Sequence, residues 1–313
     1  MIEMFARSIV MSLAWFAGVN AIASMTAILA SIAIGKANPI GRPRLLMTIR
    51  LFPAFAATVF VGTMFLPAQW AFEPRDTEET LGLVVYALAM VGGLLLARSV
   101  GRAILIARAG RQFRPGEEAV SFGGADVRQV DDLPGVSLAG VLKPRILVNS
   151  QVVDGLSPSE LDVAIAHEVA HRDAFDNLTR WAFICAPDFL GGSTIAKRLE
   201  QEWREAAELR ADAQASRGDA GRAVDLASAL IKVARLSAAW TGQSPAPSWS
   251  TLHDSALLEL RVRHLMNGSV LRVEPLPSPL LTMTVCLAAT IAAVPLLAET
   301  VHRLTETLVA VLP

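Results

Sequence analysis

Residues 8–35 read SIVMSLAWFAGVNAIASMTAILASIAIG and contain no charged side chain. A helix of about 20 apolar residues crosses the roughly 30 Å core of a bilayer, so this stretch is long enough to span a membrane. Three more uncharged runs follow, at residues 51–72, 80–97 and 275–298. The alternative for the first run is a cleaved signal peptide, but the apolar core of a signal peptide has only about 7–15 residues. We therefore expect about four transmembrane helices, and the run 80–97 is the shortest of them.

The composition of the whole chain agrees with a membrane protein. Hydrophobic residues make up 53% of the 313 residues and charged residues only 18%. Soluble domains carry about 25% charged residues, so part of the apolar surface here must face something other than water. The net charge of −1 excludes a broadly basic nucleic-acid binder, and two cysteines exclude a disulfide scaffold. We expect the lipid bilayer, and no nucleic acid, among the partners.

The basic residues near the ends of the runs predict the orientation, because cytoplasmic loops are enriched in Lys and Arg. The first loop and the segment after the third run are basic, whereas the second loop and the tail are not. The first group consists of Lys36, Arg42, Arg44, Arg50, Arg98, Arg102, Arg108, Arg111 and Arg114, and the second group of Arg75 and Arg303. This pattern predicts an N-terminus outside and residues 98–274 in the cytoplasm.

Only residues 115–274 have soluble character. Short β-like runs broken by turn signals occupy residues 119–153, and the pattern is helical from Ser157 onward. We therefore expect a mainly α membrane protein with three divisions. These are 1–114 with three transmembrane helices, 115–274 as an α-rich cytoplasmic domain with a small β-sheet, and 275–313 with the fourth helix. Residues 181–196 are too broken to span a bilayer and are expected at the membrane surface or over the soluble core.

The soluble stretch contains a metal-ligand pattern on a predicted helix. Ser157 and Glu160 form a capping box that starts this helix. His167 and His171 follow in the sequence HEVAH, and a spacing of four places both imidazoles on one helix face, within reach of one metal ion. Glu168 is placed to reach a water molecule on that ion and is the predicted catalytic base. The alternative is a chance match on an amphipathic helix.

A third metal ligand is expected further along the chain, because catalytic zinc takes three protein ligands and keeps one position open. Residues 204–212 read REAAELRAD and offer Glu208 as this ligand, with Glu205 as the second choice. Asp212 lies one turn beyond Glu208 and is predicted to accept a hydrogen bond from a ligating histidine. The alternative is a solvated, charge-rich helix, but the small alanines beside Glu208 favour close packing.

Several of these motifs together resemble a known family. They are GVLKPRILVN at 140–149, LSPSEL at 156–161, AHEVAH at 166–171, DN at 176–177 and ELRAD at 208–212. The chain resembles the gluzincin integral-membrane metallopeptidases of the BlaR/MecR type, the β-lactam sensors, in which a cytoplasmic zinc domain lies between the third and fourth membrane helices. The HtpX and CAAX-protease group shares the His-Glu-x-x-His and Glu-x-x-x-Asp patterns and is the close alternative.

The resemblance implies a multi-pass zinc endopeptidase in a bacterial-type inner membrane. Its implied substrate is a cytoplasmic or membrane-proximal protein or peptide, such as a transcriptional repressor. An HtpX-like quality-control protease and a non-catalytic signalling scaffold are the alternatives. BlaR/MecR sensors carry an extracellular penicillin-binding domain after the fourth helix, whereas residues 299–313 are too few for a domain, so β-lactam sensing by this chain alone is not expected.

Other residues receive supporting roles. We expect an edge strand at residues 145–149 to bind an extended substrate by backbone pairing. This strand consists of Arg145, Ile146, Leu147, Val148 and Asn149. His253 or Arg261 is the expected stabiliser of the oxyanion. Asp176 and Asn177 are expected to anchor the end of the metal-binding helix, a structural role.

Overall fold

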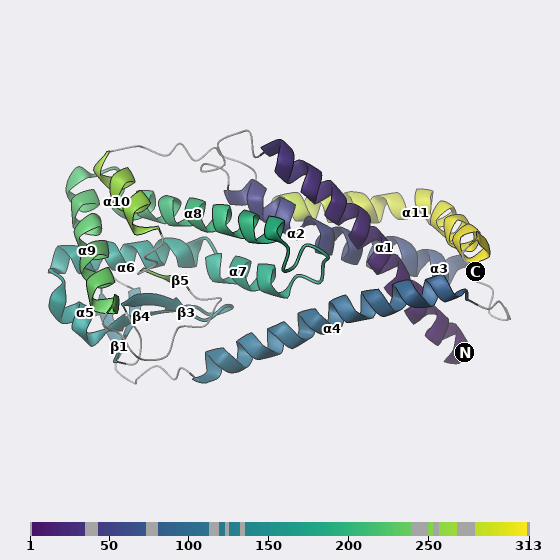
Figure 1. The fold of residues 1–313 in the computed structure, drawn as a ribbon, viewed down its shortest axis with the longest axis horizontal. Coiled ribbons are helices and arrows are strands. Elements are labelled where there is room, and N and C mark those ends of the chain that lie inside the picture. Colours follow the sequence, from purple (N-terminus) through teal and green to yellow (C-terminus); the bar gives the residue numbers. More distant parts are fainter. Residues whose placement is uncertain are drawn as a thin grey trace.

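The computed structural model describes residues 2–34, 43–72, 81–112, 119–122, 125–131, 135–238, 250–252, 257–267 and 279–311. The molecule is elongated, with long helices at one end and a sheet covered by shorter helices at the other (Figure 1). The start of the first helix and the end of the last one both lie at the end away from the sheet. In a bilayer these two ends would therefore share one side, and the sheet would lie on the other.

Long apolar helices form the end of the molecule away from the sheet. They are α1 (Ile2–Ile34), α2 (Pro43–Val59), the π-helical turn η2 (Phe60–Phe65), α3 (Leu66–Phe72), α4 (Leu83–Gln112) and α11 (Pro279–Val311). Four stretches are long and apolar enough to cross a membrane: Met4–Ala33, Pro43–Phe72, Leu83–Arg108 and Leu287–Val311. The prediction of a mainly α chain with four membrane helices is confirmed.

The last membrane helix extends further than its uncharged run. That run ends at residue 298, whereas α11 continues to Val311. Charged residues interrupt the run without ending the helix, because Glu299 pairs with Arg303 one turn later.

The membrane helices pack closely. A Cβ atom at Gly92 of α4 would lie 2.2 Å from the Leu13 carbonyl oxygen of α1, so only glycine permits this approach. The indole of Trp15 donates a hydrogen bond of 3.1 Å to Thr305 and thereby links α1 to α11. The four apolar segments thus form one bundle, with η2 and α3 packed against α11.

The sheet contains five strands. They are β1 (Ala119–Phe122), β2 (Ala125–Val130), β3 (Val136–Ala139), β4 (Arg145–Asn149) and β5 (Ser250–Thr251). Their order is β1-β2-β4-β3-β5, and β2 and β4 are parallel while the other pairs are antiparallel. The small β-sheet predicted for this part of the chain is confirmed.

The strand expected to bind substrate lies inside the sheet. Residues Arg145–Asn149 form β4, in which Ile146 pairs with Val127 of β2 and Val148 with Val136 of β3. Both backbone edges of β4 are used, so it cannot pair with an extended peptide, and the prediction of an edge strand is wrong. The continuous apolar run in this strand is typical of burial on both faces, and β1 and β5 are the edges among the described strands.

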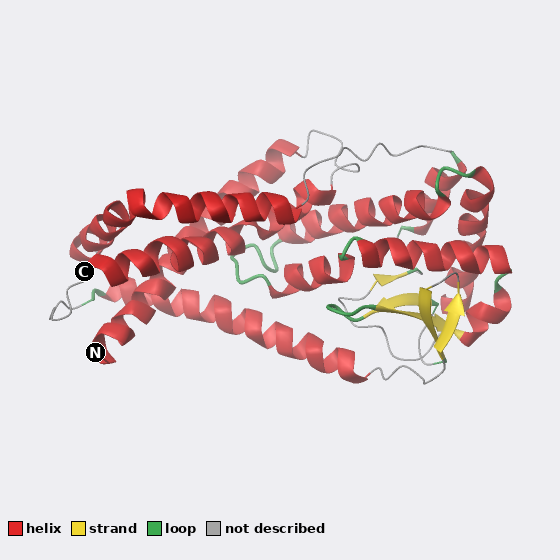
Figure 2. Ribbon diagram, turned by 180° about the vertical axis from the view of Figure 1, so that it is seen from behind, coloured by secondary structure: helices red, strands yellow, loops and turns green. Residues whose placement is uncertain are grey.

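Six further helices complete the end of the molecule that contains the sheet, and α5 and α6 contact its strands (Figure 2). They are α5 (Ser150–Gly155), α6 (Pro158–Asp173), α7 (Asp176–Cys185), α8 (Thr194–Ser216), α9 (Ala220–Ala238) and α10 (Leu258–Met266). The predicted capping box starts α6, because the Glu160 backbone N–H donates to the Ser157 hydroxyl and the Glu160 carboxylate accepts from the Ser157 N–H. Helix α6 packs between the sheet and α8 and α9, so its histidines lie in the interior.

Candidate metal centre

Three buried side chains converge between α6 and α8. His167 and His171 of α6 are fully buried, and Glu208 of α8 is 1% exposed. The His167 Nε2 and His171 Nε2 atoms lie 3.0 Å apart. Glu208 Oε2 lies 3.4 Å from the first nitrogen and 3.5 Å from the second. The predicted ligand set is therefore brought together as a compact triangle of ligand atoms.

The triangle has the size that a tetrahedral zinc ion requires. Zinc binds His nitrogen and carboxylate oxygen at about 2.0–2.2 Å, which places two tetrahedral ligand atoms on the order of 3.3 Å apart. The observed separations of 3.0, 3.4 and 3.5 Å bracket this value. These residues form the group that could hold a metal ion in the described part of the chain, and two imidazoles with one carboxylate are ligands that suit zinc.

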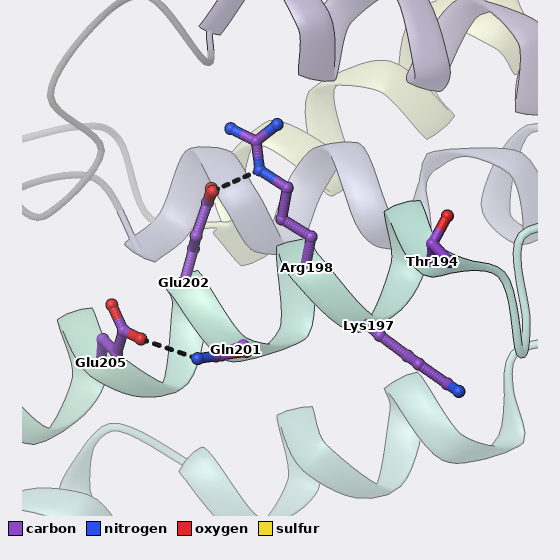
Figure 3. A pocket seen from close by; sticks show the side chains of 6 residues that line it. All are labelled: Thr194, Lys197, Arg198, Gln201, Glu202 and Glu205. Carbon is purple, nitrogen blue, oxygen red and sulfur yellow. Dashed lines mark hydrogen bonds and ion pairs between the residues drawn. The ribbon is translucent and has the colours of Figure 1, made fainter. Parts of the chain in front are cut away.

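The second choice for the third ligand, Glu205, points elsewhere. Its Oε1 atom accepts a hydrogen bond of 3.2 Å from Gln201 one turn earlier on α8. Both residues line a surface cavity together with other polar side chains of α8 (Figure 3). Glu208, three residues later, occurs on the buried face of the helix.

Glu168 follows the first histidine in the sequence and is also fully buried. Both of its carboxylate oxygens are buried, and neither has a hydrogen-bond partner among the described residues. Burial raises the pKa of this carboxyl group. A buried carboxyl group without a donor is costly, so the position fits a group that acts on a water molecule or substrate that the site admits.

Two aspartates fix the orientation of the histidine rings. His167 Nδ1 lies 2.9 Å from Asp212 Oδ1, and His171 Nδ1 lies 2.6 Å from Asp176 Oδ2. Each ring therefore uses Nδ1 for a carboxylate and turns Nε2 toward the centre, as ligating histidines do. Asp212 lies where the sequence predicted it. Asp176 was expected to be only a helix anchor, and its contact with His171 was missed.

Three arginines hold these carboxylates in turn. Arg261 binds both oxygens of Asp212, at 2.8 and 2.6 Å, and its Nη1 lies 3.2 Å from Glu208 Oε2. Arg210 lies 2.5 Å from the Asp176 carboxylate, and Arg180 lies 3.2 Å from Glu208 Oε1. Arg261 is thus buried against Asp212 and Glu208. His253, the other expected oxyanion stabiliser, lies outside the described residues.

Charges in the site change the titration of its ligands in the metal-free protein. Burial alone would lower the pKa of His171, but Glu208 and Asp176 outweigh it and raise this pKa to about 9. Burial would raise the pKa of Glu208, but His171 and Arg261 hold it well below its usual range. Because a histidine ligand must be neutral, a metal ion has to displace the proton on His171.

No family model, curated protein or solved structure matches the chain. The structure shows four helices of membrane type and, beyond them, a buried group able to hold a metal ion. The sequence motifs identify the three ligand residues but neither Arg180 nor Arg210. The only signal for these two arginines was their location on the predicted helices beside the ligand motifs.

Proposed function

We propose that the chain is a membrane-embedded zinc endopeptidase that hydrolyses peptide bonds of a cytoplasmic or membrane-proximal protein. A single observation carries this proposal. The triangle of His167, His171 and Glu208 lies next to Glu168, whose buried carboxyl group lacks a described hydrogen-bond partner. Three protein ligands and an adjacent acid are the residues that metal-assisted hydrolysis uses, and zinc keeps a further position for water in such sites.

The residues divide the chemistry among them. His167, His171 and Glu208 would hold zinc, which when bound supplies a Lewis acid that lowers the pKa of water and polarises a peptide carbonyl. The Glu168 carboxylate takes a proton from the attacking water and delivers it to the leaving amine. The raised pKa of Glu168 suits both halves of this transfer, because it brings the pKa nearer to neutrality.

The proposal also includes a regulatory role, the cleavage of one target such as a transcriptional repressor. The resemblance to the BlaR/MecR type supports this role. A quality-control protease of the HtpX type shares the chemistry and differs in the number of its substrates. A scaffold without catalysis would not need an acid beside the ligand triangle.

The test compares protein N-termini in cells that express the wild type, Glu168→Gln or Glu259→Gln. Glu259 is the matched control, because its side chain is 86% exposed and pairs with Arg263 on the surface of α10. We expect Glu168→Gln to keep bound zinc and to lose every terminus that the wild type produces, while Glu259→Gln produces them all. A few new termini support a regulatory protease, and many support quality control.

Cleavage that survives in Glu168→Gln would contradict the assigned base. Zinc absent from the purified wild type would contradict the metal centre. Bound zinc without any wild-type terminus, in cells and with purified membrane proteins, would favour the scaffold.

A further inference from the structure

A short segment of the soluble part contacts three membrane helices. Residues 186–193 connect α7 to α8 and lie against α1, α2 and α4 (Figure 1). Asn20 on α1 donates a hydrogen bond of 2.8 Å to a carbonyl of this segment, and Ser99 on α4 donates to the last carbonyl of α7. The stretch expected at the membrane surface or over the soluble core is thus held by the membrane helices themselves.

Arg50 of α2 is the centre of this contact. It is 1% exposed, and Asp188 is fully buried. Arg50 Nη1 binds Asp188 Oδ2 at 2.7 Å, and its Nε binds Glu200 Oε1 at 2.7 Å. Its Nη2 donates to the Phe183 carbonyl at 2.9 Å. One guanidinium group therefore joins the end of α7, the connecting segment and the start of α8.

The far parts of the same two helices hold the metal site. Asp176, the first residue of α7, binds the ring of His171. On α8, the proposed ligand Glu208 follows Glu200 by about 12 Å of helix, at 1.5 Å per residue. Both helices therefore run from the contact with Arg50 to the metal centre.

Side chains also connect the two places directly. The Arg50 guanidinium lies over the Phe183 ring at 5.9 Å, and this ring packs edge-on against Trp203 at 5.1 Å. The Arg180 guanidinium in turn lies over the Trp203 ring, 6.0 Å from its centre. The Nη2 atom of Arg180 is 3.2 Å from Glu208 Oε1. Trp203 is 3% exposed and Phe183 also 3%, so this path is buried, and close-packed interiors transmit displacements.

We propose that Arg50 is a positioning residue for the metal centre. With Asp188 and Glu200 it forms the joint through which the membrane helices set the positions of α7 and α8, and hence of His171 and Glu208. This inference rests on the proposed metal centre. A movement of α2 relative to α1 and α4 reaches the ligands through this joint.

The ion pairs of Arg50 are better suited to fixing the positions of α7 and α8 than to stabilising the fold. A buried ion pair stabilises little compared with apolar packing of the same volume, because both charges lose their water. A guanidinium group with three directed bonds, however, fixes the geometry of its acceptors. The three acceptors here belong to three consecutive pieces of chain, α7, the segment 186–193 and α8.

The experiment measures metal binding by the purified full-length chain in detergent micelles. Zinc affinity is obtained by competition with a chromophoric chelator, and the visible spectrum of bound Co²⁺ reports the coordination geometry. The first variant is Glu200→Gln, which leaves Arg50 paired with Asp188 and alters a side chain that is 29% exposed. Its matched control is Glu202→Gln, since Glu202 pairs with Arg198 on the outer side of α8.

Two further variants separate positioning from folding. Arg50→Lys keeps the charge but cannot reach three acceptors at once. The double variant Arg50→Met with Asp188→Leu removes the pair together, and such replacements are often neutral for stability. Thermal unfolding followed by tryptophan fluorescence shows which variants are folded.

We expect Glu200→Gln and the double variant to raise the zinc Kd measurably, but by less than the about tenfold that marks the lower end of the range for a direct outer partner of a metal ligand. Their Co²⁺ spectra should differ from that of the wild type, while Glu202→Gln matches it. Folded variants with wild-type Kd and spectrum would overturn the joint and leave the metal centre standing. A lower unfolding temperature with an unchanged Co²⁺ spectrum would mean that Arg50 only stabilises the fold. A wild type that binds neither metal would overturn both proposals.

Discussion

Asp176→Asn tests the support of His171 in the proposed centre. Asp176 Oδ2 lies 2.6 Å from His171 Nδ1 and 2.5 Å from an Arg210 nitrogen, and its side chain is 2% exposed. Hydrogen bonds to an ionised acceptor are roughly twice as strong as those between neutral groups. The substitution keeps the shape and an acceptor oxygen but removes the charge.

The expected loss follows from this geometry. Removal of the outer partner of a ligating histidine costs about 10–100-fold in metal affinity, or roughly 1.4–2.7 kcal/mol. Because Asn retains a carbonyl that can accept from His171, we expect Asp176→Asn to raise the zinc Kd about tenfold. Asp176→Ala, which leaves Nδ1 without its acceptor, should approach 100-fold.

Competition with a chromophoric chelator measures these constants on the purified chain. Asp173→Asn is the matched control, since the Asp173 side chain is 51% exposed and bonds to its neighbour Arg172 at the end of α6. The control should keep the wild-type Kd. Equal affinity in wild type and Asp176→Asn, or equal weakening in both variants, would refute the reasoning.

Three other expectations concern protons and packing. The pKa of His171 is raised to about 9 in the metal-free protein, so zinc must displace a proton below that pH. Zinc affinity should therefore rise up to tenfold per pH unit from neutrality to about pH 9 and then level off. Calorimetry in two buffers measures the proton release. Burial alone would raise the pKa of Glu160, but bonds from Lys232 and Ser228 lower it to about 2. The advantage of wild type over Glu160→Gln in thermal unfolding should therefore be full above about pH 4.5 and vanish as the pH falls toward 2. Leu230→Ala empties a fully buried site in the core of the soluble part and should cost about 2–5 kcal/mol in denaturant unfolding, whereas the exposed Leu142→Ala should cost almost nothing.

Those parts of the site that depend on local helix geometry could be predicted from the sequence. A spacing of four places His167 and His171 on one face of any helix, and the same rule pairs Glu208 with Asp212. The start of α6 was equally local, because a capping box involves neighbouring residues. The membrane helices were recognised from length and apolarity alone.

The remaining parts depend on packing between distant segments. Asp176 contacts His171 only because Phe175 adopts a left-handed conformation, with φ of 58°, that turns the chain from α6 into α7. The interior position of β4 depends on which strands pair with it, and its own five residues do not encode this. In the sequence Arg50 is one of several basic residues of a predicted cytoplasmic loop, and nothing there indicates its ion pair with Asp188. Non-local contacts of this kind leave no periodic pattern in a sequence.

The π-helical turn η2 makes the number of residues in the second membrane segment a constraint of its own. A π-helical turn accommodates one more residue than an α-helical turn, which shifts the phase of everything beyond it by about 100°. Ala68 and Gln69 of α3 are buried in that shifted phase, where α3 packs against α11. Deletion of a single residue from Phe60–Phe65 would restore a regular helix and rotate this face away from α11. Related chains should therefore tolerate substitutions in η2 more readily than a change in its length.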